Sequence, residues 1–130
     1  MIKQIIYNYC GLLSVLWAIL IFVLCATPGQ YLPSEKWLEL IAFDKFVHAS
    51  IFFILLSLAF LKAFKHQQTT FVFVMCFIFI FFYGVILEFM QANYFSNRSA
   101  DFYDIAANTA GSVIAVLVFK KKSQSIKFKF

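Results

Sequence analysis

The sequence predicts an all-α membrane protein with four transmembrane helices and with both termini on the cytoplasmic side (N-in and C-in). The first observation is compositional: 63% of the 130 residues are hydrophobic and only 13% are charged. Soluble domains are about 45–50% apolar and about 25% charged, and a chain this short has too little interior to bury the excess. The second observation is that the apolar residues form four long runs separated by polar segments. A bilayer is therefore the solvent that suits this chain, and its length predicts one domain, residues 1–130.

Each of the four apolar runs is long enough to cross a bilayer as a helix. About 20 apolar residues, each adding about 1.5 Å of rise, cross roughly 30 Å of hydrocarbon. The first run ends at a Thr-Pro-Gly segment, the second at Lys-His-Gln-Gln, and the fourth at three lysines. The predicted spans are residues 5–26, 46–64, 69–90 and 102–119, and a basic tail at 120–130 follows them.

The first span also has the positive start and the small residues of a signal peptide. Its apolar stretch is longer than the usual region of about 7–15 residues, and cleavage would leave an odd number of spans. We therefore interpret residues 5–26 as a retained helix.

The distribution of positive side chains predicts the orientation of the chain. Lys3, Lys62, Lys65 and the lysines of the tail all lie on one side of the membrane if the chain crosses four times. By the positive-inside rule that side is cytoplasmic, and segments 27–45 and 91–101 face outward. The net charge of +5 does not indicate a nucleic-acid partner, because five of the eleven cations stand in the last eleven residues. Such a tail fits contact with anionic membrane lipid instead.

Polar side chains gather at the predicted outer ends of the second, third and fourth spans. The set consists of Asp44, Lys45 and His48 in the second, Glu88 and Gln91 in the third, Arg98 in the segment that follows, and Asp101, Asp104 and Asn108 in the fourth. At about 100° per residue, the polar residues within each span share one helical face. Gly84, Gly111 and Ala115 continue two of these faces inward, and small residues let helices approach closely in lipid. We therefore expect the polar faces to meet in one shared site.

Each of these residues also has a structural explanation when it is taken alone. Asp101 opens a helix, where carboxylates cap free N–H groups and favour the positive end of the dipole. Asn108 and His48 can hold neighbouring helices together. Glu88 follows an almost unbroken apolar run and needs a partner, because ionisable groups near hydrocarbon are costly unless paired. The same cost makes such groups functional candidates.

The order and spacing of the polar residues match the pattern of a known family. The motifs are DK-x2-H at 44–48, YG-x3-E-x2-Q at 83–91, Arg98, D-x2-D at 101–104 and N-x2-G at 108–111. Over about residues 11–119 the chain resembles the VanZ-like family of small bacterial membrane proteins. That family is named after an accessory protein of low-level resistance to the glycopeptide antibiotic teicoplanin, and it supplies no catalytic roles to carry over. The resemblance implies a multi-pass protein of the bacterial inner (cytoplasmic) membrane that acts in the cell envelope.

Two functions of different classes fit these residues. In the first, the site binds the headgroup of a lipid or of a lipid-linked envelope precursor. Arg98 and Lys45 then hold phosphate, and His48, Glu88 and Asp104 are the acid–base candidates if a reaction follows. In the second, the chain is a non-enzymatic scaffold that docks a membrane-protein partner or a second copy of itself. A transporter fits less well, because the four spans show no inverted repeat.

The sequence predicts neither a cofactor nor a metal. Asp44, His48, Glu88 and Asp104 offer nitrogen and oxygen ligands, but the chain has no HExxH motif and only one histidine on this side. No serine lies in a G-x-S-x-G turn. The three cysteines contain no CxxC pair, and we interpret them as buried apolar residues.

Overall fold

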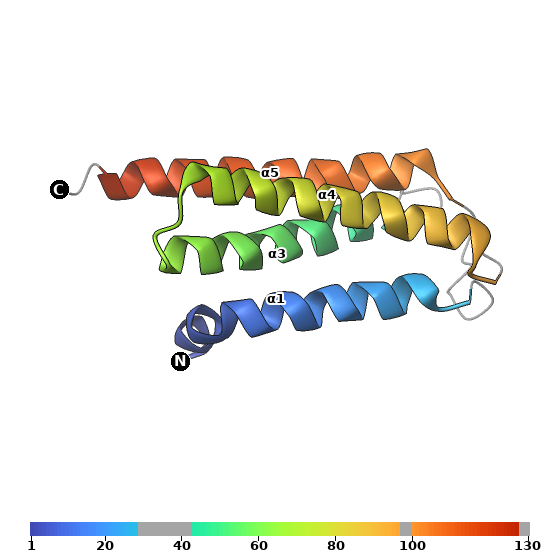
Figure 1. Ribbon diagram of the computed structural model, residues 1–130, viewed down its shortest axis with the longest axis horizontal. Helices are drawn as coiled ribbons and strands as arrows, with labels where there is room; N and C mark the ends of the chain where they lie inside the picture. Colours follow the sequence, from blue (N-terminus) through green and yellow to red (C-terminus); the bar gives the residue numbers. More distant parts are fainter. Residues whose placement is uncertain (29–42, 97–99, 128–130) are drawn as a thin grey trace.

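Four long helices run back and forth along one axis in the computed structural model of the protein (Figure 1). The structure describes residues 1–28, 43–96 and 100–127. The helices are α1 (Ile2–Ala26), α3 (Phe43–Lys65), α4 (Thr70–Asn93) and α5 (Phe102–Lys127), and the described residues contain no strand. All four helices are long and apolar enough to cross a membrane. The expectation of an all-α protein with four membrane-spanning helices is confirmed.

The helices extend past the apolar runs from which the spans were predicted. α3 begins at Phe43, so Asp44 and Lys45 stand in its first turn. α4 continues to Asn93 and therefore carries Gln91, and α5 continues through the lysines. The reason is that a helical backbone continues into the polar membrane surface, whereas the hydropathy signal ends with the hydrocarbon.

The first residues of α1 and the last turns of α5 lie at the same end of the bundle (Figure 1). The opposite end is formed by the end of α1, the start of α3, the end of α4 and the start of α5. An even number of crossings requires this arrangement. Which end faces the cytoplasm stays a prediction from the lysine distribution.

The outward faces of the helices are apolar. Phe71, Phe79 and Phe89 of α4 are 69%, 71% and 60% exposed. Exposed apolar area is unfavourable in water by roughly 25 cal/mol per Å², whereas lipid chains solvate it. These faces therefore suit contact with the hydrocarbon of a bilayer.

α3 contacts all three other helices and carries much of the buried core. Phe52, Leu55, Leu56 and Phe60 are its most deeply buried apolar side chains. The ring of Phe60 packs edge-on against Phe73 of α4 and against Phe119 of α5, with centroid separations of 5.1 and 5.5 Å.

Side-chain hydrogen bonds from and to the middle of α1 attach this helix to α3 and α4. The indole N–H of Trp17 donates to the carbonyl of Ile51 in α3 at 2.9 Å. The hydroxyl of Tyr83 in α4 donates to the carbonyl of Ala18 at 2.6 Å. In an apolar surrounding, neither polar group could be left without a partner at low cost. All three cysteines are free thiols. The expected burial is confirmed for Cys10 and Cys25 in α1, whereas Cys76 in α4 is only partly buried.

The closest approach of two helices is between α3 and α5, which run parallel. A Cβ atom added at Gly111 would overlap the carbonyl group of Ala49 and would lie 2.9 Å from its Cα. Only a residue without a side chain allows this backbone contact. The small residues that the sequence places on the inner face of the fourth span thus have the packing role expected of them.

We expect Gly111→Ala to lower the thermal stability of the detergent-solubilised protein, because the added Cβ pushes α3 and α5 apart. Overpacking of this kind costs about 1–3 kcal/mol. Gly11→Ala is the matched control, since a Cβ there meets only the flexible end of the Lys62 side chain. Thermal unfolding of both variants tests the expectation. A loss at residue 111 no larger than the loss at residue 11 would contradict it.

Candidate functional site

The polar side chains that were expected to converge lie together at the end of the bundle where α3 and α5 begin and α4 ends (Figure 1). We call this set the end cluster, and its members are Asp44, Lys45, His48, Glu88, Asp101, Asp104 and Asn108. Arg98, which the sequence also assigned to the site, lies outside the described residues. The convergence itself follows from helices that start and stop at one level.

Lys45 carries the ion pairs of the end cluster. Its Nζ atom donates to Oδ2 of Asp101 at 2.6 Å, to Oδ2 of Asp44 at 3.1 Å, and to Oδ1 of Asp104. An ammonium group has three donors, so each of them is matched to a carboxylate. Lys45 therefore links α3 to the first turn of α5. A phosphate bound by this side chain would have to displace a carboxylate.

Asp101 caps the start of α5 and pairs with Lys45 at the same time. Its Oδ1 accepts the N–H of Tyr103 at 2.8 Å, and its own carbonyl accepts the N–H of Asp104 at 2.9 Å. The Lys45 ammonium and, after it, the Tyr103 N–H hold the pKa of Asp101 below its usual value. The helix-cap explanation that the sequence offered for Asp101 is confirmed, and the ion pair is an additional interaction.

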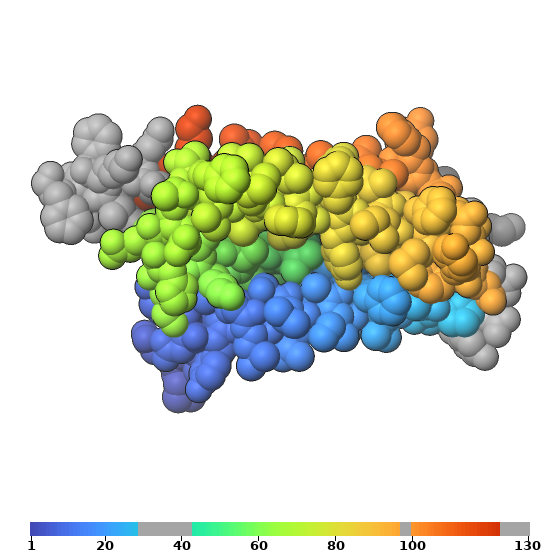
Figure 2. Space-filling view, in the orientation of Figure 1, coloured from blue at the N-terminus to red at the C-terminus, as the bar shows by residue number. Residues whose placement is uncertain are grey.

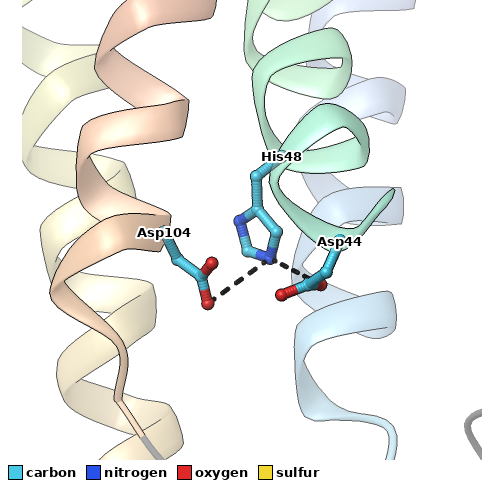
Figure 3. A group of neighbouring side chains, drawn as sticks. All are labelled: Asp44, His48 and Asp104. Carbon is cyan, nitrogen blue, oxygen red and sulfur yellow. Dashed lines mark ion pairs between the residues drawn. The ribbon is translucent and has the colours of Figure 1, made fainter. Parts of the chain in front are cut away.

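His48 is buried and lies between two carboxylates (Figure 3). Its Nε2 is 3.7 Å from Oδ1 of Asp44 and 3.8 Å from Oδ2 of Asp104. Its Nδ1 donates to Oδ1 of Asn108 at 3.0 Å. Because Asn108 engages Nδ1, Nε2 is the ring nitrogen that remains to exchange a proton with a ligand. Both Nε2–carboxylate distances exceed a normal hydrogen bond, so these carboxylate oxygens can also accept from a third group.

The side-chain amide of Asn108 lies close to α4. The Ser112 hydroxyl donates to the backbone carbonyl of Asn108 at 3.0 Å, a bond within α5. On α4, a Cβ at Gly84 would lie 3.3 Å from Nδ2 of Asn108 and 3.0 Å from the ring of Phe52. Gly84 therefore leaves the space that the amide occupies.

Glu88 and Gln91 use backbone partners. Glu88 is 2% exposed, and its Oε2 accepts the N–H of Asp101 at 3.3 Å, which joins α4 to the start of α5. Gln91 is also buried, and its Nε2 donates to the carbonyl of Cys25 in α1 at 3.3 Å. From the sequence, Glu88 was expected to need a partner such as Arg98, Lys45 or His48, and Arg98 lies outside the described residues. A backbone group is present at every residue, so no sequence signal could identify the backbone partners of Glu88 and Gln91.

One subset of the end cluster has the spacing of a metal site. Single ligand atoms of Asp44, His48 and Asp104 lie within 4.8 Å of one another. The ammonium of Lys45 already pairs with both of these carboxylates, so a metal ion would have to compete with it. The expectation of no resident metal stays a prediction, which elemental analysis of the purified protein tests.

A sequence model described as VanZ/LLP1 matches residues 5–126, which is nearly the whole chain. No curated protein and no solved structure matches the chain. The match agrees with the resemblance that the spacing of the polar motifs indicated.

We expect Lys45→Met to destabilise the protein, because it removes the cation from three carboxylates. The loss should be about 1–3 kcal/mol, below the roughly 3–5 kcal/mol of a fully buried broken pair, since the Lys45 side chain is 30% exposed. The double variant Lys45→Met/Asp104→Asn should recover part of this loss, because residue 104 then carries no unpaired charge. Unfolding in detergent measures these two variants and the single variant Asp104→Asn, which completes the cycle.

Asp44→Asn is the control for this ion pair. The Asp44 side chain is 67% exposed, so its loss should stay within about 1 kcal/mol. Strictly additive losses for the changes at residues 45 and 104 would show that the two side chains are not coupled.

Proposed function

The chain belongs to the VanZ/LLP1 family, and from this premise we propose that the end cluster of this multi-pass membrane protein binds the headgroup of a lipid or of a lipid-linked precursor of the cell envelope. The cluster lies at one end of four helices that can cross a membrane, which is the level at which headgroups lie. The family resemblance supports a place in the bacterial inner membrane and a role in envelope chemistry, including susceptibility to the glycopeptide teicoplanin.

The geometry of His48 is the observation that carries the proposal. A buried imidazole is oriented through Nδ1 by Asn108, while Nε2 faces carboxylate oxygens that are too distant to be its hydrogen-bond partners. The bond between Nδ1 and Asn108 is enough to hold the two helices together, whereas the placement of Nε2 beside two carboxylates is not needed for that. An oriented ring nitrogen beside open acceptors is instead an arrangement for receiving a polar ligand.

The charges of the end cluster favour a headgroup that donates hydrogen bonds. Among the described residues, the end cluster has four acidic members, Asp44, Glu88, Asp101 and Asp104. It has one member that is a lysine or arginine, Lys45. Carboxylates accept from N–H and O–H groups and repel phosphate. We therefore assign an amine or hydroxyl of the headgroup to the oxygens of Asp44 and Asp104, beside Nε2 of His48. The Lys45 donors are already matched, so Lys45 positions these carboxylates.

The proposal requires only that the end cluster binds the headgroup, and it does not require a reaction. If a reaction follows, His48, Glu88 and Asp104 are the acid–base candidates, because they are buried groups of the cluster and proton transfer requires a group within hydrogen-bond reach. Asp44, Lys45, Gln91, Asp101 and Asn108 would then bind or position the ligand.

A scaffold without a ligand is the second candidate. It is favoured by the fact that Lys45–Asp104, His48–Asn108 and Glu88–Asp101 each join two different helices. In this case the end cluster fixes the packing of the bundle, and a partner protein docks on it. The two candidates predict different effects when one side chain of the end cluster is removed. A headgroup site loses its lipid preference, whereas a scaffold loses protein abundance.

The test compares lipids with and without hydrogen-bond donors. Phosphatidylethanolamine offers N–H groups, phosphatidylglycerol offers O–H groups, and phosphatidylcholine offers neither. We expect native mass spectrometry of the purified protein to retain one of the first two lipids and to release phosphatidylcholine. Retention of phosphatidylethanolamine identifies an amine as the ligand group, and retention of phosphatidylglycerol identifies a hydroxyl.

His48→Ala should abolish this lipid preference at normal protein abundance, because it removes the oriented ring nitrogen. Ser50→Ala is the matched control on the same helix, since the Ser50 hydroxyl bonds only to the carbonyl of Phe46 in its own helix. In cells, His48→Ala and Glu88→Gln are then scored for teicoplanin and envelope-stress sensitivity against membrane-protein level. Equal retention of all three lipids, together with reduced abundance of His48→Ala, would favour the scaffold.

A further inference from the structure

The first turns of α1 are not in line with the rest of the helix. Tyr9 has φ −109° and ψ 15°, a non-helical conformation inside Ile2–Ala26. In Figure 1 the coil that precedes it is turned away from the long axis that the remainder of α1 follows. Figure 2 shows the same residues projecting past the body of the bundle, at the end opposite the end cluster.

This short segment has two distinct faces. At about 100° per residue, Ile2, Ile5, Ile6 and Tyr9 fall within an arc of about 100°. Lys3, Gln4 and Asn8 lie opposite, together with Tyr7, whose ring faces the ammonium of Lys65. The four apolar side chains are 72%, 49%, 38% and 57% exposed. The structure thus leaves an amphipathic turn with an uncovered apolar face, which is the pattern of a helix that lies in a membrane surface.

Lys65, at the end of α3, holds the bend. Its Nζ lies 3.4 Å from the carbonyl oxygen of Tyr7 and 3.2 Å from that of Asn8, and it stands 5.3 Å from the centre of the Tyr7 ring. In a straight helix these carbonyls accept N–H groups four residues later. A side chain that inserts at this point is one of the recognised causes of a helix kink. The bend is therefore fixed by a contact with another helix.

The charge at this end of the bundle has one sign. The acidic and basic side chains that the structure describes here are all basic, namely Lys3, Lys62, Lys65, His66, Lys120, Lys121 and Lys122. The described acidic residues, Asp44, Glu88, Asp101 and Asp104, all belong to the end cluster at the opposite end. A surface of exposed lysines without acidic neighbours complements a layer of negative charge.

We propose that residues 2–9 form an interfacial segment that docks on an anionic lipid surface, with the isoleucines in the acyl boundary and the lysines among the phosphates. The bend at Tyr9 is what allows this, because a continuous α1 would carry Lys3, Gln4 and Asn8 along the membrane normal. Lys65 then has two functions: it supplies donors to the carbonyls at the bend, and it adds to the positive surface. This contact is separate from the headgroup site at the other end.

The test measures the depth of two neighbouring positions. The full chain, with its three cysteines changed to alanine, carries a spin label at Ile6→Cys or, as the matched control on the polar face, at Gln4→Cys. The protein is reconstituted in phosphatidylcholine vesicles with or without phosphatidylglycerol. We expect the label at residue 6 to collide several-fold more with oxygen than with a water-soluble nickel chelate, and the label at residue 4 to show the reverse. Phosphatidylglycerol should enlarge this contrast.

Lys65→Met separates the bend from simple charge attraction, with Lys62→Met as the control that removes the same charge from the same end. Lys62 packs over Gly11 and makes none of the carbonyl contacts. The contrast between residues 4 and 6 should be lost in Lys65→Met and kept in Lys62→Met. Equal collision ratios at both positions in both lipids would overturn the proposal. Shielding of both labels by a second copy, detected as dipolar broadening at high label density, would also overturn it.

Discussion

The backbone contact between α3 and α5 at Ala49 and Gly111 is the constraint on which the rest of the structure depends. The two helices run parallel from the same end of the bundle. A residue of α3 therefore faces a residue of α5 that is about equally far from the start of its own helix, along the whole length of the pair. Lys45 meets Asp104, His48 meets Asn108 one turn deeper, and Phe60 meets Phe119 near the far end. If a side chain at residue 111 separated the helices, every one of these pairs would lengthen together. The close approach therefore sets the geometry of the end cluster.

Parallel helices also explain why the acids and the lysines lie at opposite ends. The N-terminus of a helix has a partial positive charge and its C-terminus a partial negative one. α3 and α5 both begin at the end cluster, where Asp44, Asp101 and Asp104 stand in or beside a first turn. Both end among lysines. The helix dipoles of the two central elements thus favour the charge distribution from which the orientation in the membrane was predicted.

The sequence predicted the members of the end cluster because each one interrupts an apolar run at one level of a span. It could not predict how they pair. The backbone N–H of Asp101 was not expected as a partner of Glu88, and the Lys45 ammonium, which was expected to contact phosphate, pairs with three carboxylates. The bend at Tyr9 was not predicted either, because Lys65, the side chain that contacts the carbonyls at the bend, lies far away in the chain.

The sequence by itself determined that this protein has four membrane helices, that polar groups collect at one end of three of them, and that the chain resembles the VanZ-like family. Hydropathy, helical periodicity and motif spacing are local properties, and they can be read from the sequence without knowledge of the fold. Only the tertiary structure decided which polar atoms face each other. Those pairings depend on the rotation and separation of whole helices, and these are set by contacts between helices, such as the backbone contact of Ala49 with Gly111, that no single segment encodes.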